Sequence, residues 1–143
     1  MPNYVYNRIV FYDERLIDKI WDDKEIAVDF GILIPEPKTK EECIDIFGDK
    51  YIDKGDYHLM HERGDEWFNW YDWRCHYWGT KWNAWEGEIC FKGNGEIVIS
   101  FITAWGPPVP WIKALSEFGI AFTHYWRDEF EPCEEVQEYN CCF

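Results

Sequence analysis

The stretch that decides the fold is Glu88-Ile89-Cys90-Phe91, followed by Lys92-Gly93-Asn94-Gly95 and then by Glu96-Ile97-Val98-Ile99-Ser100-Phe101-Ile102. Asn94-Gly95 between two apolar runs is among the strongest short-range signals for a β-hairpin. The β-branched and aromatic residues on both sides favour extended strands. The sequence therefore predicts a hairpin, and the segments on either side of it decide what kind of sheet it joins.

Upstream of the hairpin, the residues predict a strand, a helix and a second strand. Residues 4–12 are rich in β-branched and aromatic side chains. Asp13 is a candidate helix cap, and residues 16–21 place apolar side chains at helical spacing. The apolar run 26–34 ends against Pro35 and is expected to be a strand, since proline restricts the preceding residue and cannot donate to a ladder.

Downstream, Pro107 to Pro110 suit the entrance of a helix that Gly119 closes, and residues 120–126 form a last expected strand. The apolar face of this helix is expected to comprise Trp111, Ile112, Leu115 and Phe118. Two β-α-β units with a hairpin between them predict an α+β, ferredoxin-like sandwich, with a mostly antiparallel sheet and two helices on one face.

We divide the chain into a single ferredoxin-like domain, residues 1–126, and an acidic, Cys-containing C-terminal extension, residues 127–143, whose order or disorder the sequence leaves open. Residues 36–86 are interpreted as an insertion into the domain, polar up to about residue 66. A Trp-rich helix is expected within the insertion, stopped by a C-terminal glycine. Its aromatic face is expected to carry Trp67, Trp70, Arg74 and Trp78, with Gly79 next.

The charge of the chain limits its partners. With 28 acidic residues against 14 basic ones, the net charge is −14 at pH 7. Such a surface repels phosphates and anionic lipids, so duplex nucleic acid and membranes are not expected partners, whereas basic protein surfaces are. No signal peptide or bilayer-spanning run is visible, which predicts a cytosolic protein with six free cysteines.

Several motifs together resemble the YubB-like family. They are Met1-Pro2-Asn3, Ile34-Pro35-Glu36-Pro37, Trp78-Gly79-Thr80-Lys81-Trp82-Asn83-Ala84 and Thr103-Ala104-Trp105-Gly106-Pro107-Pro108. The resemblance spans the chain to Trp126 and implies a ferredoxin-like domain carried by plasmids, phages and integrated elements. It implies no catalytic residues, because the family's role is unassigned. The chain departs from the family pattern in its Cys-rich acidic tail and at Tyr4-Val5.

Neither a metal centre nor a catalytic site is convincing from the residues. His58, His61 and Glu62 could share a helix face, but two further ligands would have to come from elsewhere. Cys75 and His76 are adjacent, so on a helix their side chains diverge. No phosphate-binding glycine loop or nucleophile elbow is present. We therefore expect a non-enzymatic protein without catalytic residues, metal or cofactor.

The block after the aromatic helix has two interpretations. It forms either a small recognition site, in which a cation and an amide lie between aromatic walls, or a rigid turn, in which Thr80 and Asn83 bond the backbone while Trp78 and Trp82 anchor the turn to the core. The candidate binding residues are Trp78, Lys81, Trp82, Asn83 and Trp105.

The functional expectation is a protein-binding protein that presents carboxylates to a basic surface. It is extended to inhibition of a host defence nuclease, such as a CRISPR effector, by nucleic-acid mimicry. The alternative is a small enzyme, or a ligand or single-strand nucleic-acid binding module that uses the Trp78–Asn83 region. The sequence leaves the oligomeric state open. The acidic residues expected to contact the partner are Glu41, Glu42, Asp45, Asp49, Asp53, Asp56, Asp128, Glu129, Glu131, Glu134 and Glu135.

Overall fold

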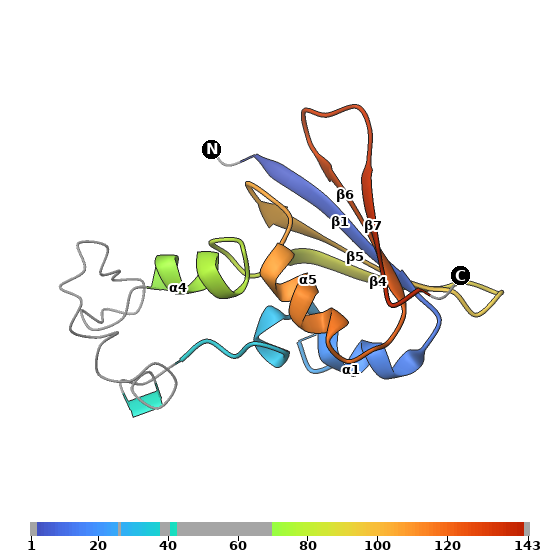
Figure 1. Ribbon diagram of the computed structural model, residues 1–143, viewed down its shortest axis with the longest axis horizontal. Helices are drawn as coiled ribbons and strands as arrows, with labels where there is room; N and C mark the ends of the chain where they lie inside the picture. Colours follow the sequence, from blue (N-terminus) through green and yellow to red (C-terminus); the bar gives the residue numbers. More distant parts are fainter. Residues whose placement is uncertain (1–2, 26, 38–40, 43–69, 142–143) are drawn as a thin grey trace.

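The structure is a computed structural model that describes residues 3–25, 27–37, 41–42 and 70–141. A five-stranded antiparallel sheet has the strand order β4-β5-β1-β6-β7. Its strands are β1 (Tyr4–Phe11), β4 (Trp85–Phe91), β5 (Ile97–Ala104), β6 (Phe122–Asp128) and β7 (Glu135–Tyr139). The first four have the arrangement of a ferredoxin-like fold, and β7 adds a fifth strand outside β6, as Figure 1 shows.

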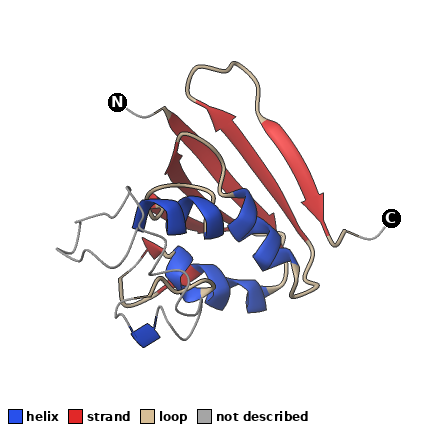
Figure 2. Ribbon diagram, turned by 60° about the vertical axis from the view of Figure 1, so that its left-hand side comes forward, coloured by secondary structure: helices blue, strands red, loops and turns tan. Residues whose placement is uncertain are grey.

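The helices that pack against this sheet lie on one of its faces (Figure 2). The longer ones are α4 (Trp70–Tyr77) and α5 (Val109–Ser116). The others are short: η1 (Glu14–Leu16), α1 (Ile17–Ile20) and η2 (Phe30–Ile32), with β2 (Trp21–Asp22) and β3 (Ala27–Val28) forming a separate two-stranded ribbon. None of the helices in the described ranges is long and apolar enough to cross a bilayer. The predicted α+β, ferredoxin-like fold is confirmed.

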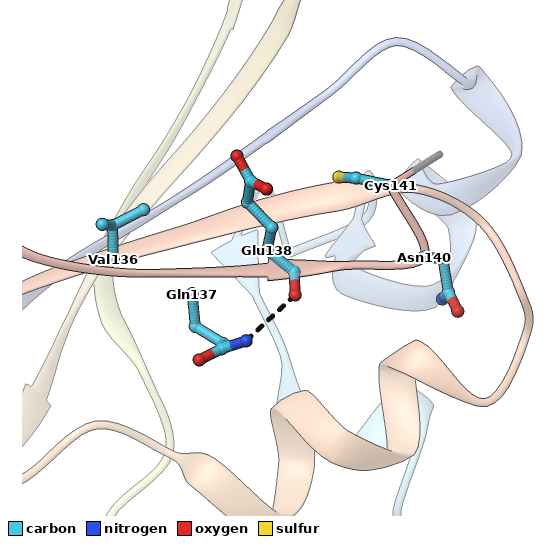
Figure 3. Close-up of a pocket in the computed structure, with 5 residues that line it drawn as sticks. All are labelled: Val136, Gln137, Glu138, Asn140 and Cys141. Carbon is cyan, nitrogen blue, oxygen red and sulfur yellow. Dashed lines mark hydrogen bonds between the residues drawn. The ribbon is translucent and has the colours of Figure 1, made fainter. Parts of the chain in front are cut away.

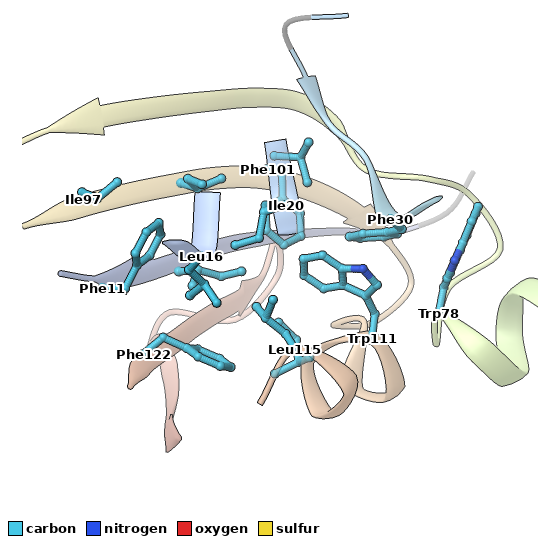
Figure 4. Packing of buried hydrophobic residues seen from close by; sticks show 14 of the residues in the cluster. Phe11, Leu16, Ile20, Phe30, Trp78, Ile97, Phe101, Trp111, Leu115 and Phe122 are labelled. Carbon is cyan, nitrogen blue, oxygen red and sulfur yellow. The ribbon is translucent and has the colours of Figure 1, made fainter. Parts of the chain in front are cut away.

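The core lies between the sheet and α1 and α5, as the close-up in Figure 4 shows. Alternate residues of β1 and β5 point into it, as the period of a strand requires. Helix α5 contributes Trp111, Ile112 and Leu115, all fully buried. Phe30 sits at the centre, with its ring 4.6 Å from that of Trp111 and 5.7 Å from that of Phe101.

The hairpin prediction is confirmed in both strands and turn. Lys92 accepts a hydrogen bond from the Gly95 N–H at 3.2 Å, and Gly95 has a φ of 89°. Glycine is favoured at this position because the left-handed region strains other residues. The stop of the aromatic helix at Gly79, which has a φ of 87°, is also confirmed.

The expected strand over 26–34 is wrong. Only Ala27–Val28 is extended in the described part of this run, and it pairs with β2, not with the main sheet. The Asp29 side chain accepts a hydrogen bond from the Gly31 N–H at 2.8 Å, which turns the chain into η2 and sends Phe30 into the core. Among the described residues, the first strand after β1 that joins the main sheet is therefore β4.

The structure answers a question that the sequence left open, the order of the tail from residue 127. Glu135–Tyr139 forms β7 and pairs in register with β6, from Trp126 opposite Glu135 to Phe122 opposite Tyr139. The rings of Phe122 and Tyr139 stack at 4.8 Å, which secures the strand to the core. The sequence did not predict this strand, because its two glutamates and its glutamine replace the apolar residues that a strand pattern needs.

Candidate functional site

Two members of the predicted binding block are structural. Trp78 is 3% exposed, and its indole N–H donates to the Ile34 carbonyl at 2.9 Å. The Asn83 amide oxygen accepts from the N–H groups of Phe30 and Ala84, both at 2.9 Å, while its nitrogen donates to Asp29 at 2.8 Å. These polar atoms are committed to the fold, as the rigid-turn interpretation expected.

Thr80 also agrees with the rigid-turn interpretation, because its hydroxyl donates to the Ala104 carbonyl at 3.0 Å. Trp82 does not, since 37% of it is exposed and it cannot be a core anchor. Its ring lies 6.0 Å from that of Trp85, at the rim of the sheet.

The remaining block residues form an exposed cluster, which we call the aromatic patch: Lys81, Trp82 and Trp105. The Lys81 ammonium lies 4.2 Å from the centre of the Trp82 ring and 3.9 Å from that of Trp105. Both distances are within the range of cation–π attraction. Trp105 is 51% exposed, so one cation already holds two large rings at the surface.

The turn that carries Trp105 is unusual. Trp105 has a φ of 68°, in the left-handed region that a bulky residue rarely adopts. Its N–H donates to the Asn3 carbonyl at 2.8 Å, and the Gly106 N–H donates to the Ala104 carbonyl at 2.8 Å. The backbone therefore holds the ring in place beyond the end of β5.

A chain of buried polar groups crosses the sheet beneath this turn. The Asn7 amide nitrogen donates to the Val5 carbonyl at 3.1 Å and to the Thr103 hydroxyl at 2.9 Å. The Thr103 hydroxyl donates to the Gly106 carbonyl at 2.7 Å. His124 Nε2 lies 2.9 Å from the Asn7 amide oxygen.

The hydrogen bonds fix the direction of this chain. Since the Asn7 nitrogen is the donor to Thr103, its oxygen must be the acceptor, so His124 carries its proton on Nε2. Desolvation by burial lowers the pKa of His124 to about 4, so the ring is neutral at pH 7. We call this set, Asn7, Thr103 and His124, the polar chain.

The polar chain connects the two walls of a cleft of about 540 Å³. One wall is the Trp105–Pro107 turn, to which Thr103 is bonded. The other wall contains Trp126, whose ring stacks on His124 at 4.9 Å. A buried polar network restricts the motion of the groups that it joins, so the two walls are held at a fixed position relative to each other.

Carboxylates are among the residues that line the cleft. The lining residues are Val5, Trp105, Gly106, Pro107, Trp126, Asp128, Glu131, Pro132, Cys133 and Glu135. Asp128 and Glu135 belong to the ends of β6 and β7, and the loop between these strands supplies Glu131 (Figure 1). The cleft therefore combines aromatic walls with negative charge.

The predicted partner-binding acids divide into two groups. Asp128, Glu129, Glu131, Glu134 and Glu135 gather on the β6–β7 connection, while Glu41 and Glu42 are exposed elsewhere. Asp45, Asp49, Asp53 and Asp56 lie outside the described residues, as do His58, His61 and Glu62. Within the ranges that the structure describes, no three His, Cys, Asp or Glu side chains gather as metal ligands do.

A second cavity, of about 430 Å³, runs along β7 (Figure 3). Its lining residues are Val136, Gln137, Glu138, Asn140 and Cys141. The polar groups there bond the protein's own backbone: Gln137 donates to the Glu138 carbonyl at 3.1 Å, and Asn140 donates to that of Ser116 at 2.7 Å. The cleft beside Trp105 is the better candidate site, because its carboxylates face a cavity with aromatic walls.

Residues 77–133 match the family model of the ferredoxin-like domain in Api92-like protein. The match begins at the end of α4 and includes both walls of the cleft, but not β1 or β7. No curated protein and no solved structure matches the chain. The comparisons therefore agree with the fold and give no activity.

Sequence reasoning missed the polar chain and Trp126. Asn7, Thr103 and His124 do give a signal, since each occupies an inward position of a strand whose neighbouring inward residues are apolar. A polar residue at such a position needs a buried partner, but the sequence cannot show which one.

Proposed function

We propose that this chain is a non-enzymatic protein-binding protein that recognises a basic surface of its partner through the cleft beside Trp105 and the acidic β6–β7 loop. The observation that supports it is the joint lining of one cleft by Trp105, Trp126 and three carboxylates. Aromatic rings and carboxylates are the groups that attract cationic side chains.

The surroundings of the cleft fit this role. Residues 128–135 contain five acidic residues and no basic one. Phe130 in this loop is 75% exposed, which places a large apolar ring among the carboxylates. Protein interfaces commonly combine such an aromatic anchor with a charged rim, and the net charge of −14 would speed the encounter with a basic partner.

The narrower form of the proposal is nucleic-acid mimicry, in which the protein occupies the basic channel of a host defence nuclease such as a CRISPR effector. Its support is the net charge, the gathering of acidic residues on one loop, and the resemblance of the sequence to a family of mobile elements. A channel built for phosphates would accept closely spaced carboxylates.

A pull-down with the tagged chain at low and high salt tests this function, with a variant that carries Glu129→Gln, Glu131→Gln and Glu135→Gln as the control. We expect the tagged chain to recover a nucleic-acid-binding enzyme at low salt. This enzyme should be lost at high salt, displaced by duplex DNA and not retained by the variant. Recovery of the same partners by the variant, or of salt-resistant partners alone, would contradict the proposal.

A second candidate function rests on the aromatic patch. Trp82 and Trp105 expose their rings beside Lys81, an arrangement that suits stacking of single-stranded bases. Fluorescence anisotropy with a labelled single-stranded oligonucleotide separates the two functions. Binding that Lys81→Met weakens would favour the nucleic acid, and its absence would leave the basic protein partner.

A further inference from the structure

The loop between β6 and β7 contacts two guanidinium groups of the protein itself: Arg127 donates to the Glu131 carbonyl at 3.2 Å, and Arg8 binds a carboxylate. Arg8 donates to both carboxylate oxygens of Glu134, at 3.0 and 2.8 Å. Its guanidinium carbon also lies 3.8 Å from the centre of the Tyr125 ring. The hydrogen bonds from Arg8 lower the pKa of the Glu134 carboxyl, which keeps this pair ionised. An aromatic ring and a carboxylate together thus bind an arginine on this face of the sheet.

A second aromatic ring and a second carboxylate follow directly in the sequence, at Trp126 and Glu135. Trp126 stands directly opposite Glu135 in the register of β6 and β7. Because successive side chains of a strand alternate between faces, Trp126 points to the face opposite Tyr125, and Glu135, its direct partner, shares the face of Trp126. This is the helix-covered face, as the stacking of Trp126 on the buried His124 shows.

On that face, Trp126 and Glu135 line the cleft, where Asp128 and Glu131 add carboxylates and Trp105 adds a second ring. No lysine or arginine is among the described residues that line it. The ring of Trp105 already contacts one cation, since the Lys81 ammonium lies 3.9 Å from the ring centre. The cleft therefore offers groups of the kind that hold Arg8; Lys81 lies on the Trp105 ring, and Arg127 donates to the backbone carbonyl of Glu131.

We propose that this cleft binds the guanidinium of an arginine side chain from the partner, between Trp126 and the carboxylates of Glu131 and Glu135. This inference rests on the proposed function and names the chemistry of its contact. Arginine is favoured over lysine because its flat guanidinium stacks on an indole while its N–H groups pair with a carboxylate, as Arg8 does with Tyr125 and Glu134.

Calorimetric titration of the full chain with a peptide of alternating Arg and Gly tests the inference. Matched peptides replace each arginine by lysine or by citrulline, which has the shape of arginine without its charge. The variants are Glu135→Gln and Trp126→Leu, and Glu138→Gln is the control, since it makes the same charge change on the same strand outside this cleft. We expect about tenfold weaker binding for Glu135→Gln and Trp126→Leu, and less than about twofold for Glu138→Gln.

A second readout uses ethylguanidinium chloride and follows the indole N–H signals by NMR. We expect a saturable shift of the Trp126 and Trp105 signals that Glu135→Gln weakens and that neutral ethylurea does not produce. Arginine-peptide binding that neither variant weakens, or equal binding of the lysine peptide, would overturn the arginine site and leave the proposed function standing. Failure of every basic peptide and of the lysate pull-down would overturn both.

Discussion

Asn7 and His124 meet inside the sheet, where Nε2 of His124 lies 2.9 Å from the Asn7 amide oxygen. The two residues are 117 positions apart in the chain and come from adjacent strands, β1 and β6. Both are almost completely buried. A pair of buried polar side chains costs stability unless each hydrogen bond is made, so this contact gives the clearest tests of the structure.

Replacement of Thr103 by valine should destabilise the fold by about 1–3 kcal/mol, because Asn7 loses an acceptor and the Gly106 carbonyl loses its donor. Chemical denaturation measures the loss. Thr123→Val is the matched control, at a half-buried position of β6, and should change the free energy of unfolding by less than about 0.5 kcal/mol. Equal effects of the two substitutions would contradict the role of the polar chain.

The buried His124 should make stability depend on pH. Its pKa falls from 6.5 to about 4 on folding, so the unfolded chain takes up the proton first as the pH falls. The contribution of neutral His124 to the free energy of unfolding is complete above pH 6.5 and is lost as the pH falls from 6.5 toward about 4. A shift of this size corresponds to about 3 kcal/mol.

Denaturation of the wild type and of His124→Gln across this pH range measures the effect. The variant should lose less stability on acidification, since glutamine can still donate to Asn7 but does not titrate. His76→Gln, at an exposed position of α4, is the matched control for the loss of an imidazole. A wild-type slope equal to that of His124→Gln would show that the histidine is not buried in its neutral form.

Substitution of Gly79 by alanine should destabilise the protein by more than about 2 kcal/mol. A Cβ at this position would collide with the Pro110 ring and crowd the Val109 nitrogen, and the φ of 87° adds backbone strain. Gly119→Ala is the control, because Gly119 has a similar φ of 75° but open space around it. It should cost about 1 kcal/mol. Equal losses in thermal denaturation would mean that α5 does not pack against the end of α4.

Lys81→Met should lower stability by about 0.5–1 kcal/mol, because the cation between Trp82 and Trp105 is removed. The tryptophan fluorescence should also change, since two indoles lose a charged neighbour. Lys113→Met makes the same chemical change at an exposed position of α5 and should leave the stability and the tryptophan fluorescence nearly unchanged. An identical response of the two variants would place Lys81 in solvent, away from the rings.

Local signals in the sequence predicted the elements that local chemistry controls. Gly95 and Gly79 end their segments with the positive φ that only glycine adopts without strain. The prolines at the start of α5 and the buried Trp111, Ile112 and Leu115 agree with the predicted helix. Phe118, also expected on its apolar face, lies past the end of α5 and is 46% exposed. The run 26–34 misled because its apolar residues fit a buried strand, whereas the side-chain hydrogen bond of Asp29 redirects the backbone.

By itself, the sequence determined the ferredoxin-like fold class, the hairpin, the stop of α4 at Gly79 and the sign of the charge, since these follow from local residue patterns and composition. Only the tertiary structure decided that Trp105 and Trp126 line one cleft and that Glu135 faces it while Glu134 binds Arg8. These relations depend on strand order and register, where a shift of one residue exchanges the faces of a strand. Residues far apart in the chain meet only when those pairings form.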